Sequence, residues 1–389
     1  ALGDIFGLGG SSFISRLFGE KKFEDAKRIS VFSFYGAIVC GVVVTVVLML
    51  LRSPILGLLG ASEATWEYAS QYYTCIALGA PFIIVALTPS NQLRTEGFAT
   101  ASMIGSVLGA VVNIILDPVM IFGLGWGAAG AATATVIGNV CTDIFFVWFL
   151  IKKSRNLSVN PKGFHISGAE IGAVFAIGIP ASVTNLMQSI GIALTNRALL
   201  GFGDDKVAAM GIVMKINMIA ALVLVGFAFG GQPLIGYNYG AKNRERLMKT
   251  LKLSLLTAVV IMTIGLIVFQ VFPGQIMSIF SATDEMLQMG KSAMRLLSLC
   301  FIPAAFGIVF STLFQALGFG TYSLLMTLLR QLIIILPAAW ILSKFLGVTG
   351  VWLAYPLAEI FSLTCAFFFF SRIYKRQIKT IPLQSEKKA

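Results

Sequence analysis

The strongest constraint on the fold is a series of apolar stretches, each long enough to cross a bilayer. A membrane-spanning helix needs about 20 consecutive, mainly apolar residues, and inside a bilayer only helices and closed barrels satisfy all the backbone polar groups. Ten such stretches follow one another at 29–51, 66–92, 99–123, 127–151, 169–199, 208–235, 250–272, 286–314, 320–343 and 347–371. The sequence therefore predicts an all-α polytopic membrane protein.

Composition restricts the functional classes further. Of the 389 residues, 57% are hydrophobic and 12% are charged, which is not the composition of an ordinary soluble domain. The five cysteines lie singly in apolar stretches, and the single histidine, His165, lies in a polar loop. We therefore expect no enzyme, no metal site and no other cofactor, because neither a zinc-ligand set nor a catalytic triad can be assembled. The sequence contains no GxxxxGK[ST] motif, so an ion gradient is the expected energy source of any transport.

The basic residues indicate the topology. The formal net charge is +12, and lysine and arginine gather in alternate loops and the tail, at 16–28, 94, 152–162, 242–252 and 372–388. By the positive-inside rule these segments are cytoplasmic. We expect a multi-pass protein of the cell (cytoplasmic) membrane with a cytoplasmic C-terminus. A nucleic-acid partner is not expected, because the basic residues are divided among loops instead of forming one patch.

The chain contains an internal repeat. Residues 9–28 resemble residues 230–249, and the glycines of the two segments recur at a constant offset of 221 positions. Further glycine pairs at this offset, or at one residue less, are Gly97 with Gly318 and Gly127 with Gly347. Self-similarity of this kind predicts two halves of one architecture.

The repeat predicts twelve helices in two six-helix lobes. The second half starts near His165, and its counterpart in the first half would lie before Ala1. We therefore expect the first helix and most of the second to be missing from this chain. An even number of helices in each half makes the repeats parallel, with a cleft between two bundles. The expected domains are a truncated N-lobe (1–151), a cytoplasmic inter-lobe loop (152–168), a C-lobe (169–372) and a cytoplasmic tail (373–389).

One acid, Asp117, lies in almost wholly apolar surroundings. Asn113 lies one helical turn before it, on the same helical face, and Pro118 follows directly. A carboxylate inside a membrane costs roughly 3 kcal/mol on insertion scales and is by default a candidate for a functional site. We interpret Asp117 as an ion-coupling acid. The alternative is a structural acid that caps or bonds a neighbouring helix.

Four segments together resemble the multidrug and toxic compound extrusion (MATE) family. They are GGSSFISRLFGEKK at 9–22, LRTEGFAT at 93–100, LDPVMIFGLGWGAAGAATAT at 116–135 and GGQPLIGYNYGAKNRER at 230–246. The resemblance covers essentially the whole chain, from the end of the family's second helix to its twelfth. It implies a secondary antiporter of the cell membrane that exchanges protons or sodium ions for amphipathic, often cationic, drugs, and we expect it to act as a monomer.

The same resemblance implies where the coupling ion binds. In bacterial members with an N-lobe cation site, an acid and an asparagine lie a turn apart on the fifth helix, with a threonine on the sixth helix and an acid on the first. The matching residues here are Asp117, Asn113 and Thr135, and Asn139 lies one turn beyond Thr135 on the same face. The first-helix acid would lie in the missing segment. Other branches carry their coupling acids on helices seven and ten, where this chain has amide or apolar residues, so the N-lobe site is favoured.

Further polar and adaptable side chains inside the spans are candidates for substrate contacts. Asp4 is interpreted either as a binding group for cationic substrates or as a hydrogen-bond partner between closely packed helices. Methionine adapts its shape to varied ligands, and aromatic rings stack on cations. The other candidates for the substrate cavity are Tyr35, Asn185, Met187 and Gln188.

The remaining charges inside the spans are candidates for structural or relay roles. Asp143, one turn after Asn139, either extends the polar network or is solvated or paired. The C-lobe charges are Lys215, Arg295, Arg330 and Glu359. Unpaired charges inside a membrane are rare, so we expect pairs within the lobe, such as Glu359 with Arg330 or with Lys215. A site for a substrate carboxylate is the alternative.

These observations predict a secondary active multidrug efflux antiporter whose partners are small amphipathic drugs or toxins and the lipid bilayer. The alternative is a flippase of the same wider superfamily that moves lipids or lipid-linked oligosaccharides, for which we expect a larger, arginine-rich cavity. A membrane-embedded enzyme is disfavoured because the sequence has no nucleophile with a matching base. A channel is disfavoured because the sequence has no filter-like motif.

Overall fold

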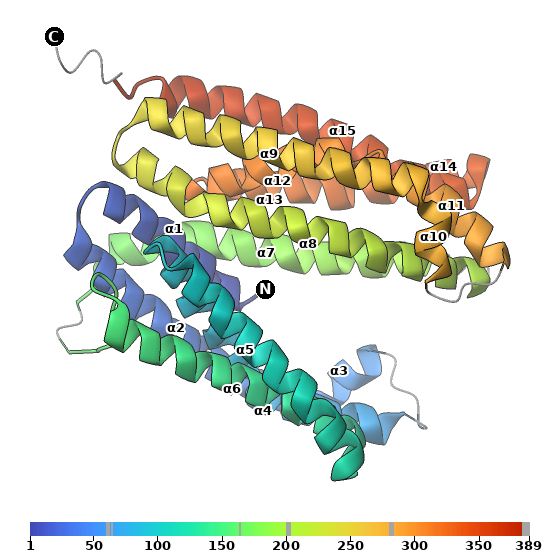
Figure 1. The fold of residues 1–389 in the computed structure, drawn as a ribbon, viewed down its shortest axis with the longest axis horizontal. Coiled ribbons are helices and arrows are strands. Elements are labelled where there is room, and N and C mark those ends of the chain that lie inside the picture. Colours follow the sequence, from blue (N-terminus) through green and yellow to red (C-terminus); the bar gives the residue numbers. More distant parts are fainter. Residues whose placement is uncertain (60–62, 64, 163–164, 200–203, 280–283, 383–389) are drawn as a thin grey trace. The chain divides into compact units, whose positions relative to one another are not determined.

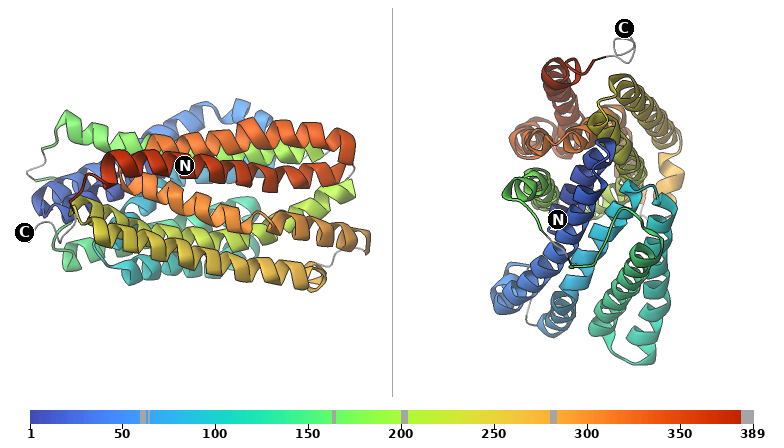
Figure 2. Two further views of the ribbon diagram at one scale, coloured as in Figure 1. Left: turned by 90° about the horizontal axis from the view of Figure 1, so that it is seen from above. Right: turned by 90° about the vertical axis from the view of Figure 1, so that its left-hand side faces the viewer.

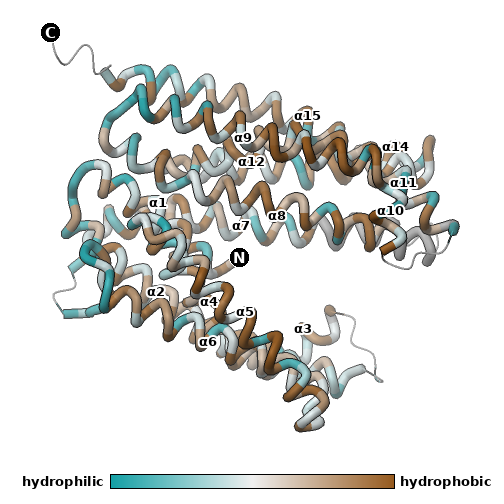
Figure 3. The backbone as a smooth tube through the Cα atoms, in the orientation of Figure 1, coloured by the Kyte–Doolittle hydropathy of each residue, from teal (hydrophilic) through white to brown (hydrophobic). Residues whose placement is uncertain are grey.

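The structure is a computed structural model that describes residues 1–59, 63, 65–162, 165–199, 204–279 and 284–382. In these residues every regular element is a helix (Figure 1). In these ranges nine helices are long and apolar enough to cross a membrane, and ten if the bent pair Met286–Ser298 and Phe301–Ala316 counts as one span. Apolar residues extend along the helices, while hydrophilic residues gather at the turns (Figure 3). The prediction of an all-α polytopic membrane protein is confirmed.

The chain divides into two compact units, Ala1–Ser182 and Val183–Ala389. The first unit contains α1 (Gly3–Gly19), α2 (Phe23–Leu50), α3 (Arg52–Leu58), α4 (Trp66–Thr95), α5 (Ala99–Pro118), the π-helix η1 (Val119–Gly123) and α6 (Gly127–Lys153). Helix α7 (Gly168–Leu199) belongs to both units. The second unit continues with α8 (Asp204–Gly240), α9 (Arg244–Val271), α10 (Pro273–Ser278), α11 (Asp284–Ser298), α12 (Phe301–Ala316), α13 (Gly320–Leu328), η3 (Leu329–Ile335), α14 (Leu336–Leu346), α15 (Val348–Ile373) and η4 (Tyr374–Ile378).

The division between the units lies inside α7 because the first part of this helix packs against α1. A Cβ atom on Gly9 would lie 2.5 Å from the carbonyl oxygen of Val174, and one on Gly178 would overlap the carbonyl oxygen of Ile5. Only glycine permits such an approach of two backbones. The lobes predicted from the repeat are defined by sequence similarity and not by compactness, so their boundaries stay a prediction.

The predicted repeat is confirmed at the turns of the two halves. Lys21 and Lys242 both have positive φ, 61° and 51°, although neither is a glycine. Gly97 and Gly318, also 221 positions apart, have φ of 97° and 92°. The same offset relates two hydroxyl pairs that are hydrogen-bonded, Ser90 with Ser102 and Ser311 with Ser323.

The halves differ where π-helical turns occur. In the first half η1 follows Pro118, whereas in the second half η3 precedes Pro337. A π-helical turn accommodates an extra residue and often marks a functional site. The offset of the repeat falls from 221 to 220 across this segment, and Asp117 lies within it. At these offsets the residues that match Asp117 are Pro337 and Ala338, so the acid of the first half has no acidic counterpart in the second.

One predicted span is not a continuous helix. Residues 286–314 were expected to form one span, but α11 and α12 meet at a bend of 49°. The amides of Leu299 and Cys300 donate to the carbonyl groups of Leu296 and Leu297, both at 3.2 Å, which tightens the chain at the bend. Pro303 lacks the N–H group that would continue the helical pattern across it.

Candidate functional site

Helices α5 and α6 approach each other closely at two glycines. A Cβ atom on Gly109 would lie 2.7 Å from the carbonyl oxygen of Gly138, and one on Gly138 would lie 2.6 Å from that of Gly109. Small residues at such contacts let membrane helices pack backbone to backbone. The two helices also lie side by side in the other views, α5 in teal and α6 in green (Figure 2). This contact brings Asn113, one turn after Gly109, beside α6.

The structure brings the predicted ion-coupling residues into one network. The Asn113 Nδ2 group donates to Asp117 Oδ1 and to Thr135 Oγ1, both at 3.3 Å. Thr135 Oγ1 in turn donates to the carbonyl oxygen of Ala131 at 3.0 Å, and Asn139 Nδ2 donates to the carbonyl oxygen of Thr135 at 2.9 Å. Asp117, Asn113, Thr135 and Asn139 are all half-buried. Three side chains thus form the network, and Asn139 joins it through the backbone.

The end of α5 shapes the surroundings of Asp117. Pro118 has no N–H group, so the regular hydrogen-bond pattern ends there, and η1 follows. The amide of Leu124 donates to the carbonyl oxygen of Val119 at 2.9 Å, and that of Trp126 donates to Met120 at 3.1 Å. The chain then turns back into α6 at Gly127, which has a φ of 51°. Asp117 therefore lies on the last α-helical turn before an irregular segment.

The charge of Asp117 has no counter-charge from the described part of the chain. No lysine, arginine or chain-terminal amino group there lies within 4.0 Å of its carboxylate oxygens. The Asn113 amide donates a hydrogen bond to it, and an amide supplies polarity without charge. A carboxylate with an amide, a hydroxyl and nearby backbone carbonyl groups is an oxygen-rich set that suits a proton or a hard cation.

The predicted substrate contacts fall into different places. Asp4 lies in the first turn of α1. The Tyr35 hydroxyl donates to the carbonyl oxygen of Val159 at 3.0 Å and so links α2 to the loop after α6. On α7 Asn185 and Met187 are half-buried and Gln188 is exposed, and these three belong to the second unit.

The charges of the second unit include one partly buried pair. Arg330 Nη1 donates to Glu359 Oε1 at 2.8 Å, and the side chains are 21% and 11% exposed. This is one of the two pairs predicted for Glu359. Lys215 and Arg295 are exposed, and neither forms an ion pair with another described residue. The pairing expected for these two cations is therefore not found in this part of the chain.

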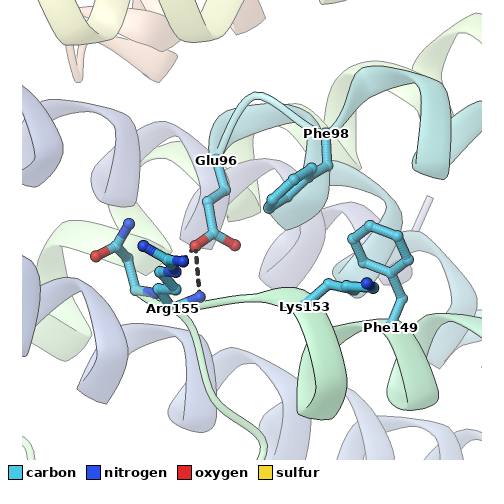
Figure 4. A pocket seen from close by; sticks show the side chains of 6 residues that line it. Glu96, Phe98, Phe149, Lys153 and Arg155 are labelled. Carbon is cyan, nitrogen blue, oxygen red and sulfur yellow. Dashed lines mark hydrogen bonds between the residues drawn. The ribbon is translucent and has the colours of Figure 1, made fainter.

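Glu96, for which the sequence predicted no role, anchors the loop after α6. Its carboxylate accepts hydrogen bonds from Ser154 Oγ at 2.6 Å and from the amides of Arg155 and Asn156 at 3.1 and 2.9 Å. Glu96 also lines a cavity of about 420 Å³ with Phe98, Phe149, Lys153, Arg155 and Asn156 (Figure 4). The matching position in the second half is Leu317, so the repeat marks Glu96 as a difference between the two halves.

Membrane-length helices in two similar halves, with a polar network around an acid inside one of them, are the architecture of a membrane transporter of the repeat-containing class. The profile of the MatE family matches residues 4–119 and 180–341. The chain belongs to the MatE family.

Relatives of known name and structure agree with this family. The chain is 30% identical over 358 residues to "Multidrug export protein MepA" of Staphylococcus saprophyticus, covering 92% of this chain and 79% of the relative. It is 31% identical, over the same shares, to the protein of that name from Staphylococcus aureus (strain MSSA476). Among solved structures, "Crystal structure of MATE in the bent conformation" matches 97% of this chain and 85% of that chain, with a TM-score of 0.92 and 27% identity. "Outward-facing conformation of a multidrug resistance MATE family transporter of the MOP superfamily" matches 96% of this chain and 84% of that chain, with a TM-score of 0.91 and 27% identity.

Proposed function

We propose that the protein is a secondary active multidrug efflux antiporter, which exports amphipathic, often cationic, compounds in exchange for protons or sodium ions. The observation that carries this proposal is the network of Asp117, Asn113 and Thr135, in which a carboxylate inside the helical bundle has no described counter-charge. A carboxylate in this position is a binding group for a transported cation. Support for drugs as the cargo comes from the relatives named as multidrug export proteins.

Ion binding acts on the protein through the end of α5. When a proton or sodium ion binds, the negative charge of Asp117 is neutralised, and the Asn113 amide loses its charged acceptor. Pro118 and η1 follow directly and form the weak point of this segment, because the hydrogen-bond pattern is already interrupted there. We infer that the occupied and unoccupied states of Asp117 favour different bends of α5. A drug that binds better to one of these states is then linked to the ion, and the linkage is reciprocal.

The test is efflux of a fluorescent cationic dye by everted vesicles that contain the full-length protein. Proton and sodium gradients are imposed separately on wild type and on Asp117→Asn, which keeps the shape of the side chain and removes its charge. The matched control is Glu67→Gln, because Glu67 is an exposed acid on α4. We expect one gradient to drive efflux by wild type and by the control, and that dependence to be lost in Asp117→Asn. Normal ion dependence in Asp117→Asn would refute the assigned site.

A further inference from the structure

Asp143 is a buried acid for which the described part of the chain supplies no partner. The residue is 8% exposed, and neither of its carboxylate oxygens has a hydrogen-bond donor in the described part of the chain. No described lysine or arginine forms an ion pair with it. Buried polar groups are nearly always hydrogen-bonded, so an exception of this kind requires an explanation. Two of the roles expected for Asp143, a solvated acid and a paired acid, do not fit the structure.

The part of α4 that lies level with Asp143 carries no charged side chain. Helices α4 and α6 run in the same direction, since Val136 lies against Gly79 and Leu150 shares an apolar cluster with Leu93. Seven residues beyond Gly79 and Val136, Ala86 is therefore level with Asp143. Residues 79–93 of α4 contain no ionisable side chain.

The other elements packed most extensively against α6 are α5 and η1, and their segments level with Asp143 offer no cation either. Residues 99–116 of α5 and all of η1 contain no ionisable side chain. The ionisable groups elsewhere on these elements and on α6 itself are Glu67, Tyr68, Tyr72, Tyr73, Cys75, Arg94, Asp117, Cys141, Lys152 and Lys153. The nearest cation along α4, Arg94, donates to Asn91 Oδ1 at 2.6 Å. An ionised carboxylate is strongly disfavoured in such surroundings, so the uncharged acid is the form that fits this conformation.

Asp143 continues the polar face on which the Asp117 network lies. Thr135, Asn139 and Asp143 are spaced four residues apart on α6 and so share one helical face. Asn113 bridges Asp117 and Thr135, and Asn139 bonds the backbone of Thr135. A line of polar side chains therefore runs from one acid to the other. A hard metal cation takes several oxygen ligands, which Asp143 lacks, whereas a proton needs only one oxygen.

We propose that Asp143 is a second proton-binding carboxylate of the first unit, which releases and regains one proton in each transport cycle. The proposal rests on the proposed antiport function and names the proton as an ion that this unit carries. In the releasing step the O–H bond of the Asp143 acid breaks, its proton passes to a water molecule on the Lys153 side, and the carboxylate remains. In the conformation that opens to the opposite side, a hydronium ion on the Asn139 side returns a proton to the same carboxylate and becomes water, so atoms and charge balance over the cycle.

The test combines chemical labelling with transport. Dicyclohexylcarbodiimide, an apolar reagent, forms an adduct with protonated carboxyl groups, and mass spectrometry of the full-length protein in lipid nanodiscs reports its yield at Asp143. A carboxyl group that exchanges its proton is labelled less at pH about 9 than at pH about 6, because a smaller fraction of it is protonated. The exposed acid Glu67 serves as the internal comparison, a carboxyl group in contact with water. Dye efflux driven by a proton gradient is then measured for Asp143→Asn, which mimics the permanently protonated acid, and for Glu67→Gln.

We expect labelling of Asp143 to fall at alkaline pH, and proton-driven efflux to be lost in Asp143→Asn while the variant still binds the dye and unfolds at the wild-type temperature. Asp143→Glu, which restores an exchangeable proton, is expected to recover part of the efflux. Equal labelling at both pH values, or normal proton-driven efflux by Asp143→Asn, would overturn the proposal. If wild type moves no dye under any gradient, the antiport function fails instead, and the labelling result still decides whether Asp143 exchanges a proton.

Discussion

Around Asp117 a single amide group connects two helices. Asn113 Nδ2 is the donor both to Asp117 on its own helix and to Thr135 on α6, at 3.3 Å in each case. Both contacts are long for hydrogen bonds of this type. Such a shared donor adjusts easily when Asp117 gains or loses a cation. The side chain of Thr135 fixes one end of this arrangement, because its hydroxyl also donates to the backbone of its own helix.

Replacement of Thr135 tests this arrangement. Thr135→Val keeps the shape but removes the acceptor for Asn113, and a lost hydrogen bond of this kind is worth about 1 kcal/mol. We expect the ion concentration for half-maximal dye efflux to change by about fivefold, and Thr135→Ser to restore it. Thr133→Val is the control, because among the described residues the Thr133 hydroxyl bonds only the carbonyl oxygen of Ala129 on its own helix. Equal effects of the two valine variants would contradict a role for Thr135 in ion binding.

Single residues were predictable where their spacing along one helix was sufficient. Asn113 and Asp117 share a face through their i, i+4 spacing, and the structure shows them bonded. Glu359 had two candidate cations, and only three-dimensional packing selected Arg330. The isolation of Asp143 was not predictable, because it depends on apolar segments of two other helices that lie level with it.

At the scale of elements, the contact between α5 and α6 positions the network. Gly109 and Gly138 face each other at a distance that leaves no room for a side chain. The opposite case is Gly172 on α7, where a Cβ atom would meet nothing within 4 Å. Glycine lowers helix stability by about 1 kcal/mol relative to alanine. It is therefore needed at the first contact and not at the second.

Alanine at these glycines is expected to have opposite effects. Gly138→Ala forces the helices apart and should lower the stability of the folded protein by about 1–3 kcal/mol, as overpacking does. Gly172→Ala should raise it by up to about 1 kcal/mol. Thermal unfolding of the purified protein in detergent gives both values. A stabilised Gly138→Ala would show that the α5–α6 contact is looser than described.

The anchoring of the loop after α6 by Glu96 is testable in the same way. Glu96→Ala removes one acceptor group for three donors, and hydrogen bonds to a charged group are worth about 1.5–3 kcal/mol each when buried. Because Glu96 is only half-buried, we expect a local effect and little change in global stability. Hydrogen exchange at the amides of Arg155 and Asn156 should become about tenfold faster, or faster still. Unchanged exchange there would mean that the loop is held by other contacts.

Periodicity predicted the existence of the elements better than their interruptions. The ten apolar stretches correspond to the nine spans and the one bent pair. The short helices α3 and α10 begin at Arg52 and Pro273, which are 221 positions apart. The offset of the repeat therefore relates the two helices, whereas hydropathy did not indicate either of them. The π-helical segments and the bend between α11 and α12 depend on local hydrogen bonds, which hydropathy does not report.

For the whole molecule, the distribution of lysine and arginine predicts which helix ends face the cytoplasm. In the first unit, the turn after α6 is at the basic end and the turn before α6 is at the opposite end. Asn160 is an exposed residue in the turn after α6, and Leu124 is an exposed residue in the turn before it. In a protein without its native cysteines, Leu124→Cys should react with a membrane-impermeant maleimide added to intact cells, and Asn160→Cys only after permeabilisation. The reverse pattern would invert the proposed topology.

The exchange of an ion for a drug is the central claim of this account, and counterflow in proteoliposomes measures it most directly. A dye gradient is imposed across the membrane without any ion gradient, and proton and sodium movements are followed separately. The account predicts that the dye drives one of these ions in the opposite direction, in wild type and in Glu67→Gln, and that this flux is absent in Asp117→Asn. Ion movement in the same direction as the dye, or counterflow that survives in Asp117→Asn, would contradict it.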